Sequence, residues 1–249
     1  MPVSEKTVEL NISRVVIEKC RRLHQRPAYS MGLTQAEEAA IGADVFIEAE
    51  PGWVGGFIQY KAMHRQASGN LRWNLNRTQN RDQHSLLCAL ESAGYPTFYC
   101  LPMFDDASEI AAWTPPPLWT KVAWMSPNAM NVPAPVDDHH HVECVPATPS
   151  NPQQWNIYSD NPTPIPGRAF WTYEQVEEAF MRSPLKGALS ALRRAAMFPG
   201  AAVGENLPLA EDLSADLYSM RERLNDVTNG LTLLAFGRSR EKTEKLPAE

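Results

Sequence analysis

Proline is distributed unevenly along this 249-residue chain, and its placement limits where regular structure can form. Nine of the 21 prolines lie between Pro127 and Pro166, and residues 115–117 are three consecutive prolines. Proline has no backbone N–H, so it interrupts helices and central strands. We therefore predict four parts: an α/β domain over residues 1–126, an irregular connector with one short strand over 127–167, a helical module over 168–237, and a disordered charged tail over 238–249.

The composition is that of a globular protein, with 43% apolar residues, 21% charged residues and a net charge of −6. This acidic balance excludes a uniformly basic nucleic-acid wrapper, so any nucleic-acid contact has to come from a local patch. No apolar run approaches the roughly 20 residues that cross a bilayer, and the first residues lack the pattern of a secretory signal. We expect a cytoplasmic protein that does not enter a membrane and whose four cysteines are free thiols.

Hydrophobic periodicity in the first domain predicts alternating strands and helices. The pattern Val8, Leu10, Ile12 indicates a strand, with Ser13 capping a helix after it. A capping box at Thr34–Glu37 starts another helix. The remaining predicted elements are a hairpin of strands 43–50 and 56–61, a helix over 83–93, a strand over 97–104, a helix over 105–113 and a strand over 120–125. Together they predict an α/β fold with a mixed sheet flanked by helices.

One group of polar residues suggests chemistry. Side chains alternate along a strand, so Gln59 and Lys61 share a face of one hairpin strand and can meet Asp44 on the other. Glu38, on the preceding helix, lies close by in sequence. Carboxylate and amide oxygens are ligands that Mg²⁺ accepts, and a lysine beside them can assist a metal-bound water. These are the groups needed to cut a phosphodiester.

The order Glu38, Asp44, then Gln59-Tyr60-Lys61 resembles the PD-(D/E)XK nuclease superfamily, in the branch that carries Q-x-K in place of E-x-K. The resemblance covers about residues 34–104 and implies a restriction endonuclease-like core. It implies that Asp44 and Gln59 hold Mg²⁺, that Lys61 is the catalytic lysine and that Glu38 assists at the metal. It also implies an endonuclease acting on DNA or RNA, in a role such as bacterial defence.

A structural interpretation of the same residues remains open. Gln59 and Lys61 would then line a solvated strand face, with Glu48 or Glu50 as a cross-strand partner. Because a glutamine replaces the usual acid, a scaffold that has lost catalysis is a further alternative. In that case the protein is a non-catalytic assembly subunit of a larger complex.

The stretch between Lys61 and Arg81 contains no acidic residue. Its basic and aromatic side chains are candidates for nucleic-acid binding, because arginine contacts phosphates and tryptophan stacks on bases. These candidates are Arg65, Arg72, Trp73, Arg77 and Arg81. The alternative is a solvated surface loop with incidental basic residues.

Three consecutive histidines, His139 to His141, suggest Zn²⁺ or another transition metal. Adjacent residues cannot all face one ion, and in a strand only His139 and His141 share a face. No second pair of ligands is identified by spacing. We therefore favour a surface loop that enters a short strand over residues 142–145, and Zn²⁺ at His139 and His141 is the weaker hypothesis.

The last part of the chain reads as helical. Thr172–Gln175 is a capping box, and its helix is expected to end near Arg182. Apolar residues then follow a heptad spacing over 213–234. A helix of this kind either binds a protein partner or a second copy, or packs against the core of its own chain.

Overall fold

The computed structural model describes residues 3–24, 28–32, 53–75, 83–111, 118–132, 140–158, 161–185, 188, 191 and 231–236. Several predicted elements lie outside these described residues. They are the capping box at 34–37, the strand over 43–50, the heptad segment over 213–230 and the tail over 238–249.

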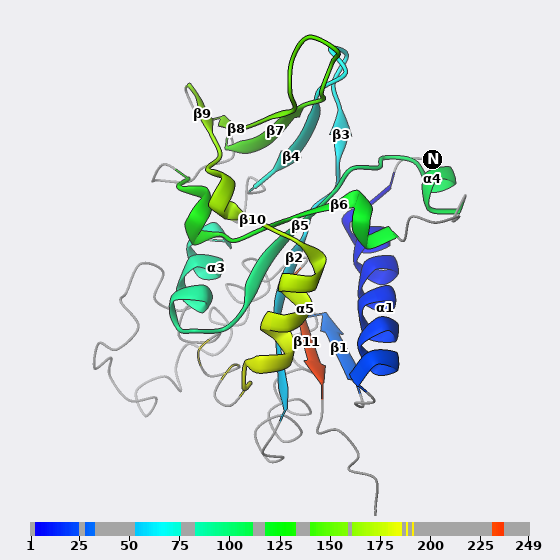
Figure 1. Cartoon of the computed structure of the whole chain (residues 1–249), viewed down its shortest axis with the longest axis vertical. Helices are drawn as coiled ribbons and strands as arrows, with labels where there is room; N and C mark the ends of the chain where they lie inside the picture. The colour runs from blue at the N-terminus through cyan, green and yellow to red at the C-terminus, as the bar shows by residue number, and fades with distance from the viewer. Residues whose placement is uncertain are drawn as a thin grey trace, which may run out of the picture.

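The described strands form two sheets (Figure 1). The main sheet has the order β1–β11–β2–β5–β6–β10. Its neighbours β2 and β5 are parallel, and the other neighbouring pairs are antiparallel. The strands of this sheet are β1 (Ala28–Gly32), β2 (Val54–Tyr60), β5 (Thr97–Pro102), β6 (Val122–Met125), β10 (Phe170–Trp171) and β11 (Leu231–Phe236).

Helices cover both faces of the main sheet, as the mixed α/β prediction requires. Helices α1 and α5 share a buried cluster with Ile58, Tyr60 and Phe98 on one face. Helix α3 packs on the opposite face, against Phe57 and Tyr99. The described helices are α1 (Glu5–His24), α3 (Gln83–Ser92), α4 (Ala107–Ala111) and α5 (Tyr173–Arg182), with short 3₁₀ turns η2 (Leu118–Lys121), η3 (Asn128–Met130) and η4 (Gly167–Ala169).

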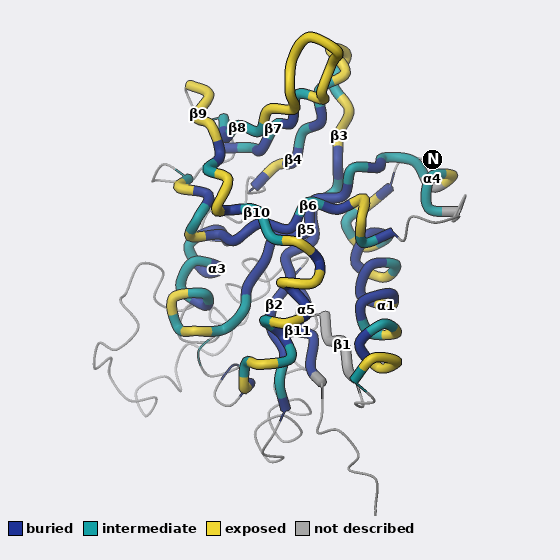
Figure 2. Tube along the Cα trace, in the orientation of Figure 1, coloured by how far each residue is buried: buried dark blue, intermediate teal, exposed yellow. Residues whose placement is uncertain are grey.

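The predicted strand at Val8–Ile12 is wrong, because this segment lies inside α1. Val8, Ile12, Val16 and Cys20 recur every four residues and are fully buried. Leu10, which fitted the alternating pattern, is 60% exposed on the outer side of the helix. Over only five residues, apolar side chains on one side of a helix are easily mistaken for the alternating apolar and polar side chains of a strand. Figure 2 shows this single buried side along α1.

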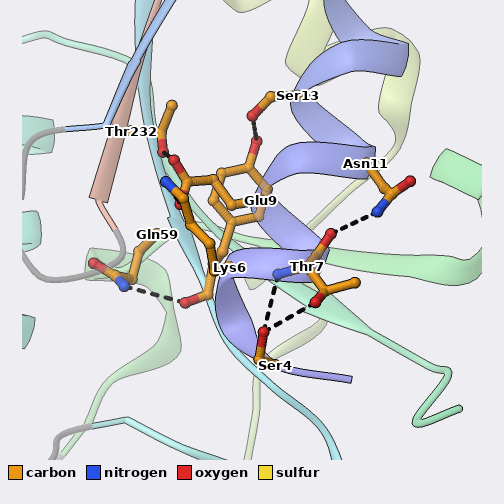
Figure 3. A network of polar contacts seen from close by, with 9 residues as sticks. Ser4, Lys6, Thr7, Glu9, Asn11, Ser13, Gln59 and Thr232 are labelled. Atoms are coloured by element: carbon orange, nitrogen blue, oxygen red, sulfur yellow. Dashed lines mark hydrogen bonds and ion pairs between the residues drawn. The ribbon is translucent and has the colours of Figure 1, made fainter. Parts of the chain in front are cut away.

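Polar contacts fix α1 to the centre of the main sheet (Figure 3). The Thr232 hydroxyl of β11 donates to Glu9 Oε1 over 3.0 Å, and Lys6 pairs with the other carboxylate oxygen. Ser13 is not a helix cap, because it lies in the interior of α1. Its hydroxyl is 2.7 Å from the Tyr60 hydroxyl of β2. These buried partners satisfy groups whose desolvation would otherwise be costly.

The end of the predicted heptad helix is wrong, because Leu231 and Leu234 belong to strand β11. This strand lies between β1 and β2 and is buried on both faces over residues 231–235. A strand covered on both sides is continuously apolar, so its leucines also matched the heptad spacing. The described residues after 168 therefore include strands as well as helix, in contrast to the predicted all-helical module.

The position of β11 also corrects the predicted hairpin. Strand β2 pairs with β11 along residues 54–59 and with β5 along residues 57–60. Along residues 57–59 both edges of β2 are therefore occupied, and neither neighbour is the strand expected at 43–50. Residues 43–50 themselves lie outside the described part of the chain.

The second sheet crosses the predicted boundary between domain and connector. It is antiparallel throughout, in the order β3–β4–β7–β8–β9. The connector was expected to hold one short strand, but it contributes three to this sheet, and among its described strands only β9 contains proline. These strands are β3 (His64–Arg65), β4 (Leu71–Asn74), β7 (His141–Val145), β8 (Gln154–Tyr158) and β9 (Pro162–Pro164).

Several predicted elements are confirmed. The helix over 83–93 is α3, and Gly94 after it takes a positive φ of 90°. The strands over 97–104 and 120–125 are β5 and β6, and the short helix is α4. Helix α5 begins at the predicted capping box, where Thr172 and Gln175 exchange side-chain-to-backbone hydrogen bonds.

Gly56 in β2 marks a close approach that only glycine permits. A Cβ atom there would lie 2.3 Å from the Pro96 carbonyl oxygen and 2.7 Å from the Phe180 ring. The missing side chain lets α5 and the start of β5 pack directly on the strand that leads to Lys61.

Membrane insertion finds no support in the helices that the structure describes, none of which combines the length and the apolar character needed to span a bilayer.

Candidate functional site

Gln59 and Lys61 lie at the carboxyl end of β2, where β2 runs parallel to β5. Both are buried, with 0% of Gln59 and 2% of Lys61 exposed. The interpretation of these residues as a solvated strand face is therefore wrong. The carboxyl ends of parallel strands are a common place for binding sites in α/β folds.

The Gln59 side chain is oriented by its own strand. Its amide nitrogen donates to the Tyr60 carbonyl oxygen over 3.1 Å (Figure 3). Because residues alternate along β2, Gln59 faces the α3 side of the sheet, whereas Tyr60 faces α1.

The Lys61 amino group contacts the first residue of α3. Its Nζ donates to Gln83 Oε1 over 2.6 Å, and Gln83 is only 1% exposed. The Lys61 backbone N–H donates to the Cys100 carbonyl oxygen over 3.2 Å, which extends the β2–β5 pairing by one residue. The lysine is therefore fixed at both ends, by β5 at its backbone and by α3 at its amine.

His84 follows Gln83 and contacts strand β5. Its Nδ1 lies 3.0 Å from the Tyr99 hydroxyl, and the two rings stack with their centroids 5.9 Å apart. Its Nε2 lies 3.4 Å from the Cys88 sulfur, one turn along α3. Burial, and secondarily the neighbouring His140 and Lys61, lower the pKa of His84 to about 4. The imidazole is therefore neutral at pH 7.

The Tyr99 hydroxyl keeps its proton at neutral pH. Burial, and secondarily the nearby Cys88, raise its pKa well above the ordinary value of 10.0. A Tyr99 hydroxyl that donates to Nδ1 of His84 places the ring proton on Nε2, toward the Cys88 sulfur. This arrangement satisfies both ring nitrogens without a charge on the imidazole.

We name Lys61, Gln83, His84, Tyr99 and His140 the lysine cluster. They come from the residue after β2, from α3 and β5, and from the residue before β7, and all five are buried. Chemically, the cluster combines an amine held by an amide oxygen with a neutral imidazole. Lys61 was identified from the sequence as a site residue, and His140 only as a member of the histidine run. Gln83 and His84 read there simply as the polar start of an apolar helix.

Four predicted site residues, Glu38, Asp44, Arg77 and Arg81, lie outside the described residues. Within the described ranges, no three His, Cys, Asp or Glu side chains are placed to hold a metal ion. Of the predicted Mg²⁺ ligands, the structure therefore places only Gln59. An amide oxygen beside a lysine is compatible with Mg²⁺ chemistry, and the carboxylates would have to come from Asp44 and Glu38.

Trp73 cannot stack on a base, so its predicted role is wrong. It is fully buried in β4, donates its indole N–H to the Pro102 carbonyl oxygen over 2.9 Å and stacks on Trp155. Arg65 and Arg72 do reach the surface. Arg65 pairs with Asp105 over 3.2 Å, so an acid distant in sequence lies beside the acid-free stretch.

The strand predicted at 142–145 is confirmed as β7. His141 stacks on Tyr158 with centroids 5.1 Å apart and lies 3.9 Å from Glu143. His139, its predicted partner in a Zn²⁺ site, lies outside the described residues. His140 points into the core as part of the lysine cluster, which agrees with the alternation of a strand.

Comparison with protein-family models, curated proteins and solved structures finds no match to this chain. The function therefore has to be argued from the chemistry of the site.

Proposed function

We propose that this protein is a Mg²⁺-dependent endonuclease that hydrolyses phosphodiester bonds of DNA or RNA, with its active site at Lys61. One observation carries the proposal: a lysine is buried at the carboxyl end of a strand, two residues after Gln59, and a glutamine holds its amine.

A buried amine is expensive for a protein to keep. Removing a cation from water costs several kcal/mol after relaxation, and a core position would be more stable with an apolar side chain. Buried ionisable groups that lie in a cluster of polar side chains are candidates for a functional site. The 2% exposure of Lys61 therefore favours a chemical role over a solubilising one.

The roles of the residues follow from their chemistry. Gln59, together with Asp44 and Glu38, would hold Mg²⁺, and the metal would supply charge stabilisation and an activated water. Lys61 would orient that water and stabilise negative charge on the phosphoryl oxygen. Helix α3 and strand β5 come after the strand with Gln-x-Lys, as the resemblance implies, but β3 and β4 of the second sheet are inserted before them.

The nucleic-acid contact in this proposal uses Arg65 and Arg72, with Arg77 and Arg81, and no longer includes Trp73. Arginine guanidinium groups would position the phosphate backbone without reading sequence. A role in bacterial defence belongs to the same proposal and is supported by the resemblance alone.

The test is metal-dependent cleavage of plasmid DNA, single-stranded DNA and RNA by the wild-type protein and by Lys61→Met. We expect Mg²⁺-dependent cleavage that falls by about a hundredfold or more in the variant, in line with the loss of a charge-stabilising group. Lys121→Met, an exposed lysine of η2, is the matched control and should retain activity. Cleavage that survives in Lys61→Met would contradict the proposal.

Absence of cleavage by the wild-type protein on all three substrates would favour the non-catalytic alternative. That alternative predicts a role in assembly, which the test would then pursue by measuring the oligomeric state.

A further inference from the structure

The residue that accepts the hydrogen bond from the Lys61 amine lies outside the Gln-x-Lys motif. We propose that Gln83 is the positioning residue for Lys61, fixing its amino group toward the reacting centre, and this rests on the nuclease function proposed above. The motif Gln-x-Lys does not include Gln83, which lies 22 residues after Lys61 in the chain.

The contact has the geometry of a strong hydrogen bond. Nζ and Oε1 are 2.6 Å apart, shorter than the usual N–H···O distance of about 2.9 Å, as expected when the donor is charged. Both side chains are buried, so water does not compete for the contact. The long lysine side chain would otherwise sample several rotamers, and this bond selects one.

Gln83 can act as a fixed point because its helix is anchored. Leu86 and Leu90 are buried against the main sheet. The next residue, His84, is tied to Tyr99 of β5 by a hydrogen bond and by ring stacking. The first turn of α3 is therefore held on the same parallel strand pair that carries Lys61.

The type of acceptor also fits a positioning role. A side-chain carbonyl oxygen accepts a hydrogen bond from the amine and can therefore orient it. Misplacing a reacting group by about 1 Å can reduce a rate by about a hundredfold. Loss of the acceptor should therefore lower the rate of the chemical step and leave substrate binding unchanged.

The experiment compares four proteins: wild type, Gln83→Leu, Gln83→Glu and Leu87→Ala. Leucine removes the acceptor, and glutamate keeps an oxygen at the same reach. Leu87→Ala perturbs the same helix without touching Lys61. One readout, independent of activity, is the exchange rate of the Lys61 amino protons with water by NMR, assigned through the loss of the signal in Lys61→Met. The other readout is kcat and KM for Mg²⁺-dependent cleavage.

We expect Gln83→Leu to speed the exchange of the Lys61 amino protons by at least about tenfold, as loss of a charge-assisted hydrogen bond implies. It should lower kcat by about tenfold or more and leave KM within about twofold. Gln83→Glu should restore both the exchange rate and kcat, and Leu87→Ala should alter stability alone.

An exchange rate in Gln83→Leu within twofold of wild type would overturn the positioning role, whatever the activity. Faster exchange with unchanged kcat would overturn it equally. Exchange that responds to Gln83 in a protein that cleaves none of the substrates would refute the nuclease and leave the positioning of Lys61 standing. The two failures are thus distinguishable.

Discussion

Acidification should destabilise the fold through His84, and the structure sets the size of the effect. The buried imidazole has a pKa of about 4, against 6.5 for an ordinary histidine. Between these values the unfolded chain binds a proton that the folded protein does not, so stability falls as the pH falls. The difference corresponds to about 3 kcal/mol in full, and to about 2 kcal/mol between pH 7.5 and pH 5.

The loss of stability at low pH is caused by the burial of His84 and by the groups around it. A proton on the ring would place a cation in a buried site beside Lys61 and His140. Neither the Tyr99 hydroxyl nor the Cys88 thiol, its two hydrogen-bond neighbours, carries a compensating negative charge at these pH values, because the pKa of each is raised by burial. Folding and protonation of His84 therefore oppose each other.

The assay is urea unfolding followed by tryptophan fluorescence at pH 7.5, 6 and 5, for the wild type and for His84→Gln. The variant does not titrate at this position but keeps every other acid and base. Subtracting the variant's change in unfolding free energy from that of the wild type therefore removes the contribution of the carboxylates. We expect the wild type to lose about 2 kcal/mol more than the variant between pH 7.5 and pH 5. A difference below about 0.5 kcal/mol would refute the assignment of His84 as a buried neutral imidazole.

Three other perturbations have defined outcomes. Gly56→Ala should lower the free energy of unfolding by at least about 2 kcal/mol in chemical denaturation, because the new Cβ would overlap the Pro96 backbone. Gly167→Ala, with no atom within 4 Å of the new Cβ, should change the free energy of unfolding little. Equal effects of the two substitutions would contradict the close packing at Gly56. Thr232→Val should cost about 1–2 kcal/mol by leaving Glu9 without a buried donor, and an unchanged unfolding midpoint would argue against that bond. The four cysteines should react slowly with a thiol reagent at pH 8 and rapidly in urea, because burial raises the pKa of each; rapid labelling of the native protein would show that they are accessible.

Sequence patterns of a few residues predicted the helices and strands whose ends are set by neighbouring residues in the chain. Helix α5 begins at a capping box, and α3 ends before Gly94, because caps and left-handed glycines act within one turn. Strands β5 and β6 were found because they are apolar and bounded by turns. In contrast, β11 and the second sheet depend on partners far along the chain, and no local pattern distinguishes a buried strand from a heptad segment.

The candidate site was predictable only where a motif spans a few residues. Gln59 and Lys61 lie two residues apart on one strand, so their shared face follows from alternation. Gln83, His84 and His140 join them through tertiary packing, which depends on the crossing from β2 to β5 and on the second sheet. Trp73 was misassigned because an aromatic residue among arginines looks the same in sequence whether it stacks on a base or fills a core.

The location of β11 has a consequence for how the chain acquires its fold during synthesis. Strand β2 emerges from the ribosome about 170 residues before its neighbour β11, and β1 emerges earlier still. Until β11 arrives, the edge strand β1 and the central strand β2 each lack the neighbour they share, and unpaired strand edges are sites of aggregation. Contacts this distant in sequence also slow folding. A chaperone that shields β1 and β2, or a nascent chain kept in contact with the ribosome, would therefore raise the yield of native protein, and truncation before residue 231 should give insoluble chains.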